Sequence, residues 1–506
     1  MNQLKAGAIL SYLLIILNNV IGLLYTPFML RMMGTNEYGL YSLAASVVAY
    51  LTVLDLGFAN SIIRYTAKFR AENKQKEQDE MFGMFFILYC CISLLTLIVG
   101  IGIYFHVDLL FGEKMTMADM HKIRIMLLLL IFNLVFTFPM SIWGSIITAY
   151  EKFVFQKLVN IIRVILNPIV MILLLLIGYK AIAMVVIITL FNVITLCINA
   201  WYCRKKLHIR IRFARFKWCF FQEIMIFSFF IFLNAIMDRA YWSFGQLILG
   251  MYVGALAVAV YAVAIQLISL FMNFSTAISG VFLPKITFLV SNKGNEENIS
   301  ELFIRIGRIQ FMVMGLILTG FLLFGKQFIA LWAGDNYMDA YPIACILFIA
   351  LLFPLTQNLG LTILQARNQL KFCSILYLLE ALCCVAISLL LVRKYGGLGC
   401  AIGTATVLIV GQVVVLNIYY YKKVQIDIPK YWEEMMKLSI IPVLLGGGAF
   451  FIFSCFTLET IWSLGISIGI YSLLYFVLFW VGGINEYERE MFRKIFYALK
   501  MYCCIN

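Results

Sequence analysis

Long apolar stretches that recur along the chain constrain its fold more than any other feature. They repeatedly reach the roughly 20 residues that a helix needs to cross a bilayer, and they lack the polar/apolar alternation of a membrane barrel. Of the 506 residues, 63% are hydrophobic and 13% are charged, so a water-soluble fold could not bury this much apolar surface. The sequence therefore predicts an all-α integral membrane protein with about 14 transmembrane helices.

The loops between the predicted spans are short. By residue number, the spans cover 9–30, 38–60, 81–105, 122–148, 154–178, 180–202, 222–249, 254–283, 306–325, 341–364, 372–392, 398–421, 438–457 and 462–483. Connections of this length leave no room for a soluble catalytic or binding domain. The function is therefore expected to lie between the helices.

Basic residues predict the orientation of the chain. Most of the 39 lysine and arginine residues fall at the two ends and in every second loop. Because positive residues accumulate on the cytoplasmic side, both termini are predicted to be cytoplasmic. The same distribution argues against a nucleic-acid partner, since the basic residues lie between apolar spans and not on one soluble surface.

Two halves of the chain are related, with an offset of about 216 residues, which is the length of six spans. Matching positions are Asn18 with Asn234, Gly34 with Gly254, Tyr41 with Tyr261, and Pro139 with Pro354. Six is an even number, so the copies form a parallel repeat, a transporter design with a central cavity between the halves. The predicted organisation is an N-terminal six-helix lobe (1–203), a basic cytoplasmic inter-lobe loop (204–221), a C-terminal six-helix lobe (222–421), and two additional helices with a cytoplasmic tail (422–506).

Few ionisable residues lie inside the predicted spans, and each is costly there unless it is paired or hydrated. Away from the first few residues of each span, they are Asp55, Arg163, Asp238, Arg239 and Glu380. Asp238 and Arg239 are either a local neutral pair in a wet cavity or contacts for a substrate or ion. We favour contacts in the cavity, because neighbours on a helix point about 100° apart. Arg163 and Glu380, with opposite charges at nearly equivalent repeat positions, predict either a structural salt bridge between the halves or a gate.

Two further arginines lie at the ends of spans. Arg31 ends the first span and Arg64 follows the second. Long basic side chains at such positions either extend to the membrane interface or bind a ligand, and both interpretations stay open.

Two prolines are candidate hinges. Pro139 and Pro354 each remove a backbone hydrogen bond inside a span, which produces either a static kink or a moving bend. The nearby Ser141 and Thr356 are expected to hydrogen-bond to the carbonyls that the prolines leave free.

Several kinds of chemistry lack their sequence signatures. The three histidines fall in loops, the thirteen cysteines have no metal-ligand spacing, and no phosphate-binding glycine-rich loop occurs. We therefore expect no cofactor, no metal and no enzymatic activity. A secondary transporter driven by an ion gradient or the membrane potential remains.

The opening of the chain resembles a known family. Residues 31–43 read RMMGTNEYGLYSL, followed by LDLGF at 54–58 and IIRY at 62–65. Weaker similarities are AYEKF at 149–153, GALAVAVYAVA at 254–264 and RKYGGLGCAIGTA at 393–405. Over its first twelve spans the chain resembles bacterial polysaccharide and O-antigen repeat-unit flippases of the multidrug/oligosaccharidyl-lipid/polysaccharide exporter superfamily.

This resemblance implies a function. It implies two six-helix lobes around a cavity lined by spans 1, 2, 7 and 8, in a bacterial cytoplasmic membrane. The cargo would be an undecaprenyl-pyrophosphate-linked oligosaccharide, carried to the outer leaflet by alternating access for O-antigen, capsule or exopolysaccharide. The substrate-binding candidates are Arg31, Arg64, Asn234 and Arg239, because arginine holds phosphate oxygens bidentately. Asp55 and Asp238 would hold these arginines or carry a coupling ion.

The expected partners are the lipid-linked oligosaccharide and membrane lipids, with a polysaccharide polymerase or assembly protein as a further candidate. Two other functions stay open. One is a cation-coupled multidrug or small-metabolite antiporter of the same superfamily. The other is a membrane-embedded polymerase or glycosyltransferase, which would need a large outward loop that this chain lacks.

Overall fold

The computed structural model describes residues 3–213, 218–291, 296–367, 369–453, 460–486, 488–490 and 493. No strand occurs among them. The α-helices are α1 Gln3–Met33, α2 Thr35–Leu51, α3 Phe58–Ala71, α4 Gln75–Phe105, α5 Val107–Phe111, α6 Met117–Ala149, α7 Phe153–Leu176, α8 Ala181–Lys205, α9 Trp218–Trp242, α10 Phe244–Tyr252, α11 Ala255–Ser291, α12 Glu296–Trp332, α13 Ala340–Thr356, α14 Asn358–Ala366, α15 Leu370–Tyr395, α16 Gly397–Leu408, α17 Leu416–Tyr419, α18 Ile428–Phe453 and α19 Ile461–Leu478. Two 3-10 segments (η1 Thr52–Asp55, η2 Asp335–Tyr337) and three π-helical segments (η3 Ile409–Val415, η4 Tyr420–Val424, η5 Phe479–Gly483) complete them.

The number of spans agrees approximately with the prediction. Among the described residues, 12 helices are long and apolar enough to cross a membrane, and counting the bent pair α13 and α14 as one span gives 13. The remaining predicted span, 222–249, is divided between α9 and α10. The prediction of an all-α, multi-pass membrane protein is confirmed, with a count of about 14 that is approximate.

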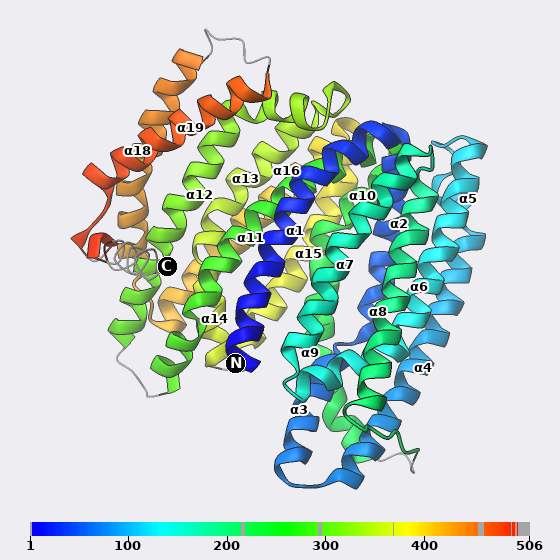
Figure 1. Ribbon diagram of the computed structural model, residues 1–506. Helices are drawn as coiled ribbons and strands as arrows, with labels where there is room; N and C mark the ends of the chain where they lie inside the picture. Colours follow the sequence, from blue (N-terminus) through cyan, green and yellow to red (C-terminus); the bar gives the residue numbers. More distant parts are fainter. Residues whose placement is uncertain are drawn as a thin grey trace, which may run out of the picture. The chain divides into compact units, whose positions relative to one another are not determined.

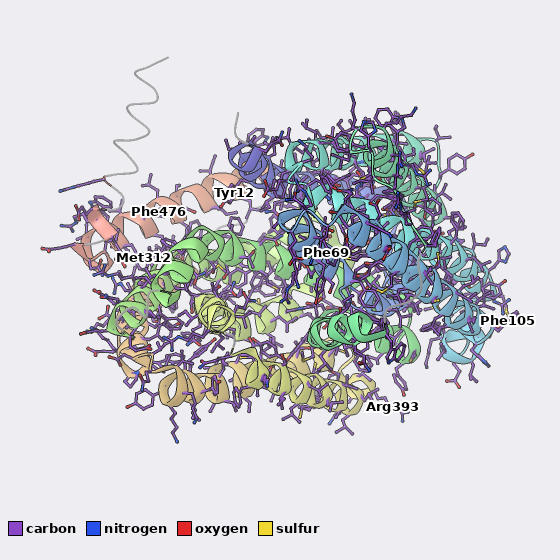
Figure 2. The ribbon with its side chains drawn as sticks, turned by 90° about the horizontal axis from the view of Figure 1, so that it is seen from below. Tyr12, Phe69, Phe105, Met312, Arg393 and Phe476 are labelled. Atoms are coloured by element: carbon purple, nitrogen blue, oxygen red, sulfur yellow. The ribbon has the colours of Figure 1, made fainter. Side chains whose placement is uncertain are left out.

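Many large apolar side chains lie on the outer surface of their helices. Figure 2 labels three of them, Tyr12, Phe105 and Phe476, which are 46%, 71% and 61% exposed. Soluble proteins rarely expose so many apolar side chains to water, whereas lipid tails solvate such side chains in a membrane. These outer faces are therefore the lipid-facing surface.

The chain divides into two compact units. Unit 1 comprises Met1–Val263 and Tyr377–Cys400, and unit 2 comprises Ala264–Leu376 and Ala401–Asn506. Within unit 1, α2, α6 and α8 pack against one another, as Figure 1 shows. Unit 1 contains the whole predicted first lobe together with part of the second. The predicted lobes at 1–203 and 222–421 stay a prediction.

The repeated glycine has a positive φ in both copies of the motif. Gly34 precedes α2 with φ 81°, and Gly254 precedes α11 with φ 121°, a region that favours glycine. The two copies also touch within unit 1, because a Cβ atom on Gly39 would lie 2.0 Å from the carbonyl oxygen of Ala255. Gly39 is therefore required for the close approach of α2 to the start of α11.

Pro139 lies inside a continuous helix. Helix α6 runs through it, and the carbonyl that it frees, on Val135, accepts a hydrogen bond of 2.5 Å from Ser93 Oγ on α4. Ser141 instead donates to the carbonyl of Phe138. The expectation that Ser141 serves the freed carbonyl is therefore wrong, because a serine on a neighbouring helix reaches it.

Pro354 lies next to a break. Helix α13 ends at Thr356, and α14 continues at an angle of 43°. Thr356 Oγ1 donates to the carbonyl of Phe353, one residue before the proline, so the expectation for Thr356 is also wrong. The carbonyl of Leu355 at the break accepts 2.7 Å from Ser275 Oγ of α11. That Pro139 and Pro354 act as moving hinges stays a prediction.

Candidate functional site

The second predicted span is broken at Asp55. Helix α2 passes into the 3-10 segment η1, which ends at Asp55, and α3 begins at Phe58. The two residues between them, Leu56 and Gly57, have left-handed backbones with φ 53° and 67°. Glycine adopts this conformation without cost, whereas Leu56 is held in it at a cost of about 1–2 kcal/mol. Half-buried Asp55 thus lies where helical hydrogen bonding is interrupted, a feature typical of binding sites in membrane transporters.

The seventh predicted span is also broken. Helix α9 ends at Trp242, and α10 begins at Phe244. Asp238 and Arg239 lie in the last turn and a half of α9, with 58% and 36% of their side chains exposed. Their charged atoms are 4.0 Å apart, the outer limit of an ion pair. This weak contact leaves both groups accessible, as the 100° between helical neighbours predicts.

The two breaks lie against each other within unit 1. Tyr50 of α2 donates a hydrogen bond of 3.3 Å to the carbonyl of Arg239, which also accepts 2.9 Å from the backbone N–H of Ser243. Helix α9 also packs against η1. Further along, the buried hydroxyls of Ser61 on α3 and Ser228 on α9 are 3.3 Å apart. We call this place, with Asp55, Asp238 and Arg239, the break junction.

Glu380 lies beside the break junction with a partner that the sequence did not indicate. The hydroxyl of Tyr241 on α9 donates to Glu380 on α15, and both side chains are buried. They are flanked by the apolar cluster of Met237, Ala240 and Ala381.

The predicted pair of Arg163 and Glu380 is not formed. Arg163 of α7 makes no ion pair within 4.0 Å in the described part of the chain, and Glu380 contacts Tyr241 instead. A salt bridge between them is therefore not part of this structure. A gate that brings them together in another state stays a prediction.

The other predicted binding residues lie on helices outside the two breaks, or their side chains lie outside the described residues. Arg31 is exposed in the last turn of α1. Arg64 is exposed on α3, with its guanidinium 5.8 Å from the centre of the Tyr65 ring. The side chain of Asn234 lies outside the described residues. The described residues include no group of three or more His, Cys, Asp or Glu that could hold a metal ion.

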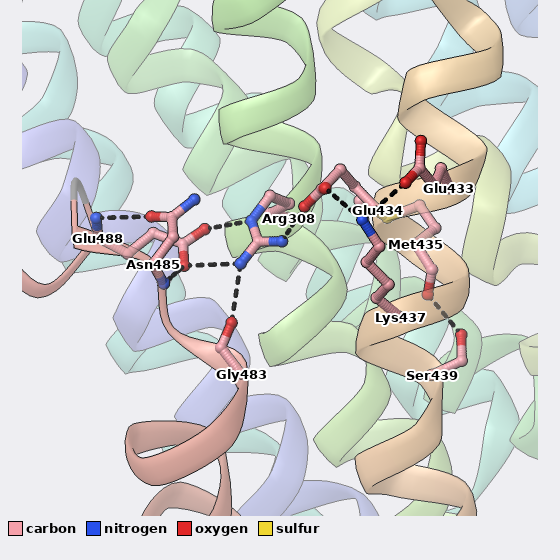
Figure 3. A network of polar contacts seen from close by, with 9 residues as sticks. All are labelled: Arg308, Glu433, Glu434, Met435, Lys437, Ser439, Gly483, Asn485 and Glu488. Atoms are coloured by element: carbon pink, nitrogen blue, oxygen red, sulfur yellow. Dashed lines mark hydrogen bonds and ion pairs between the residues drawn. The ribbon is translucent and has the colours of Figure 1, made fainter.

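A second charged cluster lies in unit 2 (Figure 3). Arg308 of α12 donates to Glu434 of α18, to both carboxylate oxygens of Glu488, at 2.7 and 3.0 Å, and to the carbonyl of Gly483 at 2.8 Å. The arginine side chain is 6% exposed and that of Glu488 is fully buried. Asn485 accepts from the backbone N–H of Glu488 and completes the ring of contacts. We call this the Arg308 cluster; it ties the last two helices to α12.

Known proteins resemble this chain in fold and in sequence. The structure is similar to that of the lipid II flippase MurJ in an inward closed conformation, with a TM-score of 0.72 and 17% identity over 93% of this chain and 97% of that one. It is also similar to an inward-facing multidrug resistance MATE family transporter of the MOP superfamily, with a TM-score of 0.57 and 17% identity over 81% of this chain and 99% of that one. At these identities the likeness shows the fold.

Sequence relatives are more specific. A protein of Shigella flexneri named as a candidate O-antigen transporter is 24% identical over 74% of this chain and 88% of its own length. The capsular polysaccharide biosynthesis protein CapF of Staphylococcus aureus is 29% identical over 44% of this chain and 55% of its own length. Residues 4–290 match the family model described as polysaccharide biosynthesis protein. Because this match covers more than half of the 506 residues of the chain, the chain belongs to the polysaccharide biosynthesis protein family.

Proposed function

We propose that this protein is a flippase for an undecaprenyl-pyrophosphate-linked oligosaccharide repeat unit. It carries the unit from the cytoplasmic to the outer leaflet of a bacterial cytoplasmic membrane by alternating access, for the synthesis of a surface polysaccharide. The membership of the polysaccharide biosynthesis family and the likeness to the fold of a lipid II flippase support this proposal.

The accessible guanidinium of Arg239 at the break junction carries the proposal. A pyrophosphate crossing the membrane needs a positive group with several hydrogen-bond donors, and a guanidinium supplies them in a planar fork. Arg239 has 36% of its side chain exposed, and its one ion pair among the described residues is the 4.0 Å contact to Asp238. Its donors are therefore available for an anionic headgroup.

The two acids of the break junction serve charge balance and ion coupling in this proposal. Asp238 balances the charge of Arg239 when no cargo is bound, and Asp55 and Asp238 are the candidates for carrying a coupling proton or cation. Arg31, in the last turn of α1, and Arg64, in the middle of α3, contact the cargo as it enters or leaves, and Asn234 contributes from α9.

The proposed cycle uses the predicted lobes. Residues 1–203 and 222–421 move as two lobes that expose the cargo first to the cytoplasmic side and then to the outer side, with both termini in the cytoplasm.

Complementation of a bacterium that lacks its own repeat-unit flippase tests this function. The wild-type chain should restore surface polysaccharide, whereas Arg239→Ala should reduce it at least about tenfold, the effect of losing one charged contact. Arg239→Lys should restore part of it. The matched control is Arg393→Ala, which removes an exposed arginine from unit 1 that stacks 5.0 Å from the Tyr252 ring.

Equal protein levels in the membrane must accompany each measurement. Normal polysaccharide in Arg239→Ala cells would remove Arg239 from the cargo path. Failure of the wild-type chain in a host with a matching glycan would contradict the flippase function itself.

A cation-coupled multidrug or metabolite antiporter is the second candidate. The likeness to a MATE transporter and the accessible carboxylate of Asp238 favour it. This function predicts resistance to cationic dyes on overproduction, lost in Asp238→Asn cells, with no effect on polysaccharide.

A further inference from the structure

A cavity of about 620 Å³ lies in unit 1, apart from the break junction. Its walls come from the start of α2, the start of α6, the end of α7, the start of α8 and the loop between α7 and α8. This volume falls within the roughly 300–1,000 Å³ of small-molecule sites. The cavity can therefore hold a large part of an amphiphilic molecule.

The cavity has an apolar wall and a charged rim. The wall consists of Leu174, Ile182, Ala183 and Val186. The rim holds Glu37, Lys122 and Lys180. Lys122 forms an ion pair with Glu37, whereas Lys180 makes no ion pair within 4.0 Å among the described residues. The rim therefore carries one excess positive charge.

The exposed apolar residues around the cavity indicate that it opens to the lipid bilayer. Ile177, Tyr179 and Val186, which lie at or beside it, are 71%, 58% and 42% exposed. On a membrane-spanning chain, exposed apolar side chains of this kind contact lipid tails. The charged rim lies where the spans α7 and α8 end and begin, at the level of the lipid headgroups, where tyrosine is also enriched.

We propose that this cavity is a binding site for an anionic phospholipid, distinct from the cargo path. Its phosphate lies at Lys180 and Lys122, and the beginning of an acyl chain lies along Ala183 and Val186. The excess positive charge selects an anionic headgroup over a zwitterionic one. This inference is independent of the proposed flippase function, because it concerns a lipid that stays bound and not the transported one.

Native mass spectrometry of the purified full chain in detergent, titrated with phosphatidylglycerol or phosphatidylethanolamine, tests the site. Phosphatidylglycerol should bind more tightly. Lys180→Ala should weaken its binding about fivefold, the effect of one lysine near an anionic headgroup. Lys205→Ala, which removes an exposed lysine from the other end of α8, is the matched control and should change nothing.

Two further variants test the charge and the shape of the site separately. Neither of them replaces Lys122, the basic partner in the ion pair with Glu37. Glu37→Gln removes the negative charge beside Lys122 and should tighten phosphatidylglycerol binding. Ala183→Phe fills the cavity and should weaken the binding of both lipids. Equal binding of the two lipids by the wild-type chain, equal effects of Lys180→Ala and Lys205→Ala, or unchanged binding in Ala183→Phe would each overturn the proposal.

Discussion

Arg308 in unit 2 has 6% of its side chain exposed and contacts two carboxylates and a carbonyl, whereas Arg239 in unit 1 has 36% exposed and one acid 4.0 Å away. Both arginines lie on helices of a membrane protein, where an unpaired charge is costly. The Arg308 cluster meets this cost with protein groups alone. Among the described residues, the break junction meets this cost only in part, which leaves room for a ligand or water. This difference is the reason why we propose a structural role for Arg308 and a functional role for Arg239.

The largest expected effect is on stability, at the Arg308 cluster. Arg308→Ala leaves Glu488 buried without its cation, and removing one partner of a buried pair costs about 3–5 kcal/mol of unfolding free energy. The apparent Tm of the detergent-purified protein should fall sharply. Arg305→Ala, one turn earlier on α12 in an exposed pair with Glu301, is the control and should cost at most about 0.5 kcal/mol. Equal Tm values for the two variants would contradict the structural role of the Arg308 cluster.

The buried contact beside the break junction should have an intermediate effect. Tyr241→Phe removes the hydroxyl that donates to Glu380, at a cost of about 1–3 kcal/mol for a buried acceptor that loses a donor. Thermal unfolding measures this loss. If Tyr241→Phe is as stable as the wild-type chain, water replaces the hydroxyl and this side of the break junction is open as well.

The hydrogen bond between the two breaks should matter less for stability. Tyr50→Phe removes one neutral bond of 3.3 Å to a carbonyl that keeps its bond from Ser243, so we expect a loss of about 0.5–1 kcal/mol. Because this bond joins α2 to α9, transport should change more than the Tm does. Unchanged transport in cells with normal protein levels would show that the breaks need not be joined there.

Arg239 itself should have the smallest effect on stability. Arg239→Ala removes a half-exposed group with one weak ion pair, so the unfolding free energy should change by about 0.5 kcal/mol or less. The Tm measurement that detects Arg308→Ala checks this directly. A loss as large as that of Arg308→Ala would mean that Arg239 is a structural residue.

The sequence predicts much of this architecture, because hydrocarbon thickness and apolar run length are both local properties. It also singles out 54–58 and the pair Asp238 and Arg239, which the structure brings together at the break junction. The break itself could not be predicted, since apolar residues continue through it and Leu56 adopts a left-handed backbone. Gly57 inside an apolar span was the one available signal.

The sequence could not predict which residues far apart in the chain contact each other. Tyr50 meets Arg239 across 189 positions, and Tyr241 meets Glu380 across 139. Arg308 lies near a predicted span end, where basic residues usually face water, and only packing against α18 buries it beside Glu434. Periodicity and composition specify which helices form, but tertiary packing decides which charges meet.

Transport in proteoliposomes tests the central claim most directly. Purified protein is reconstituted with a fluorescent undecaprenyl-pyrophosphate-linked oligosaccharide, and the fraction of label that an external quencher reaches is followed over time. We predict that the wild-type chain and Arg393→Ala move the lipid between leaflets far faster than protein-free vesicles, while Arg239→Ala does not. A wild-type rate equal to that of protein-free vesicles, or an Arg239→Ala rate equal to the wild type, would contradict this mechanism.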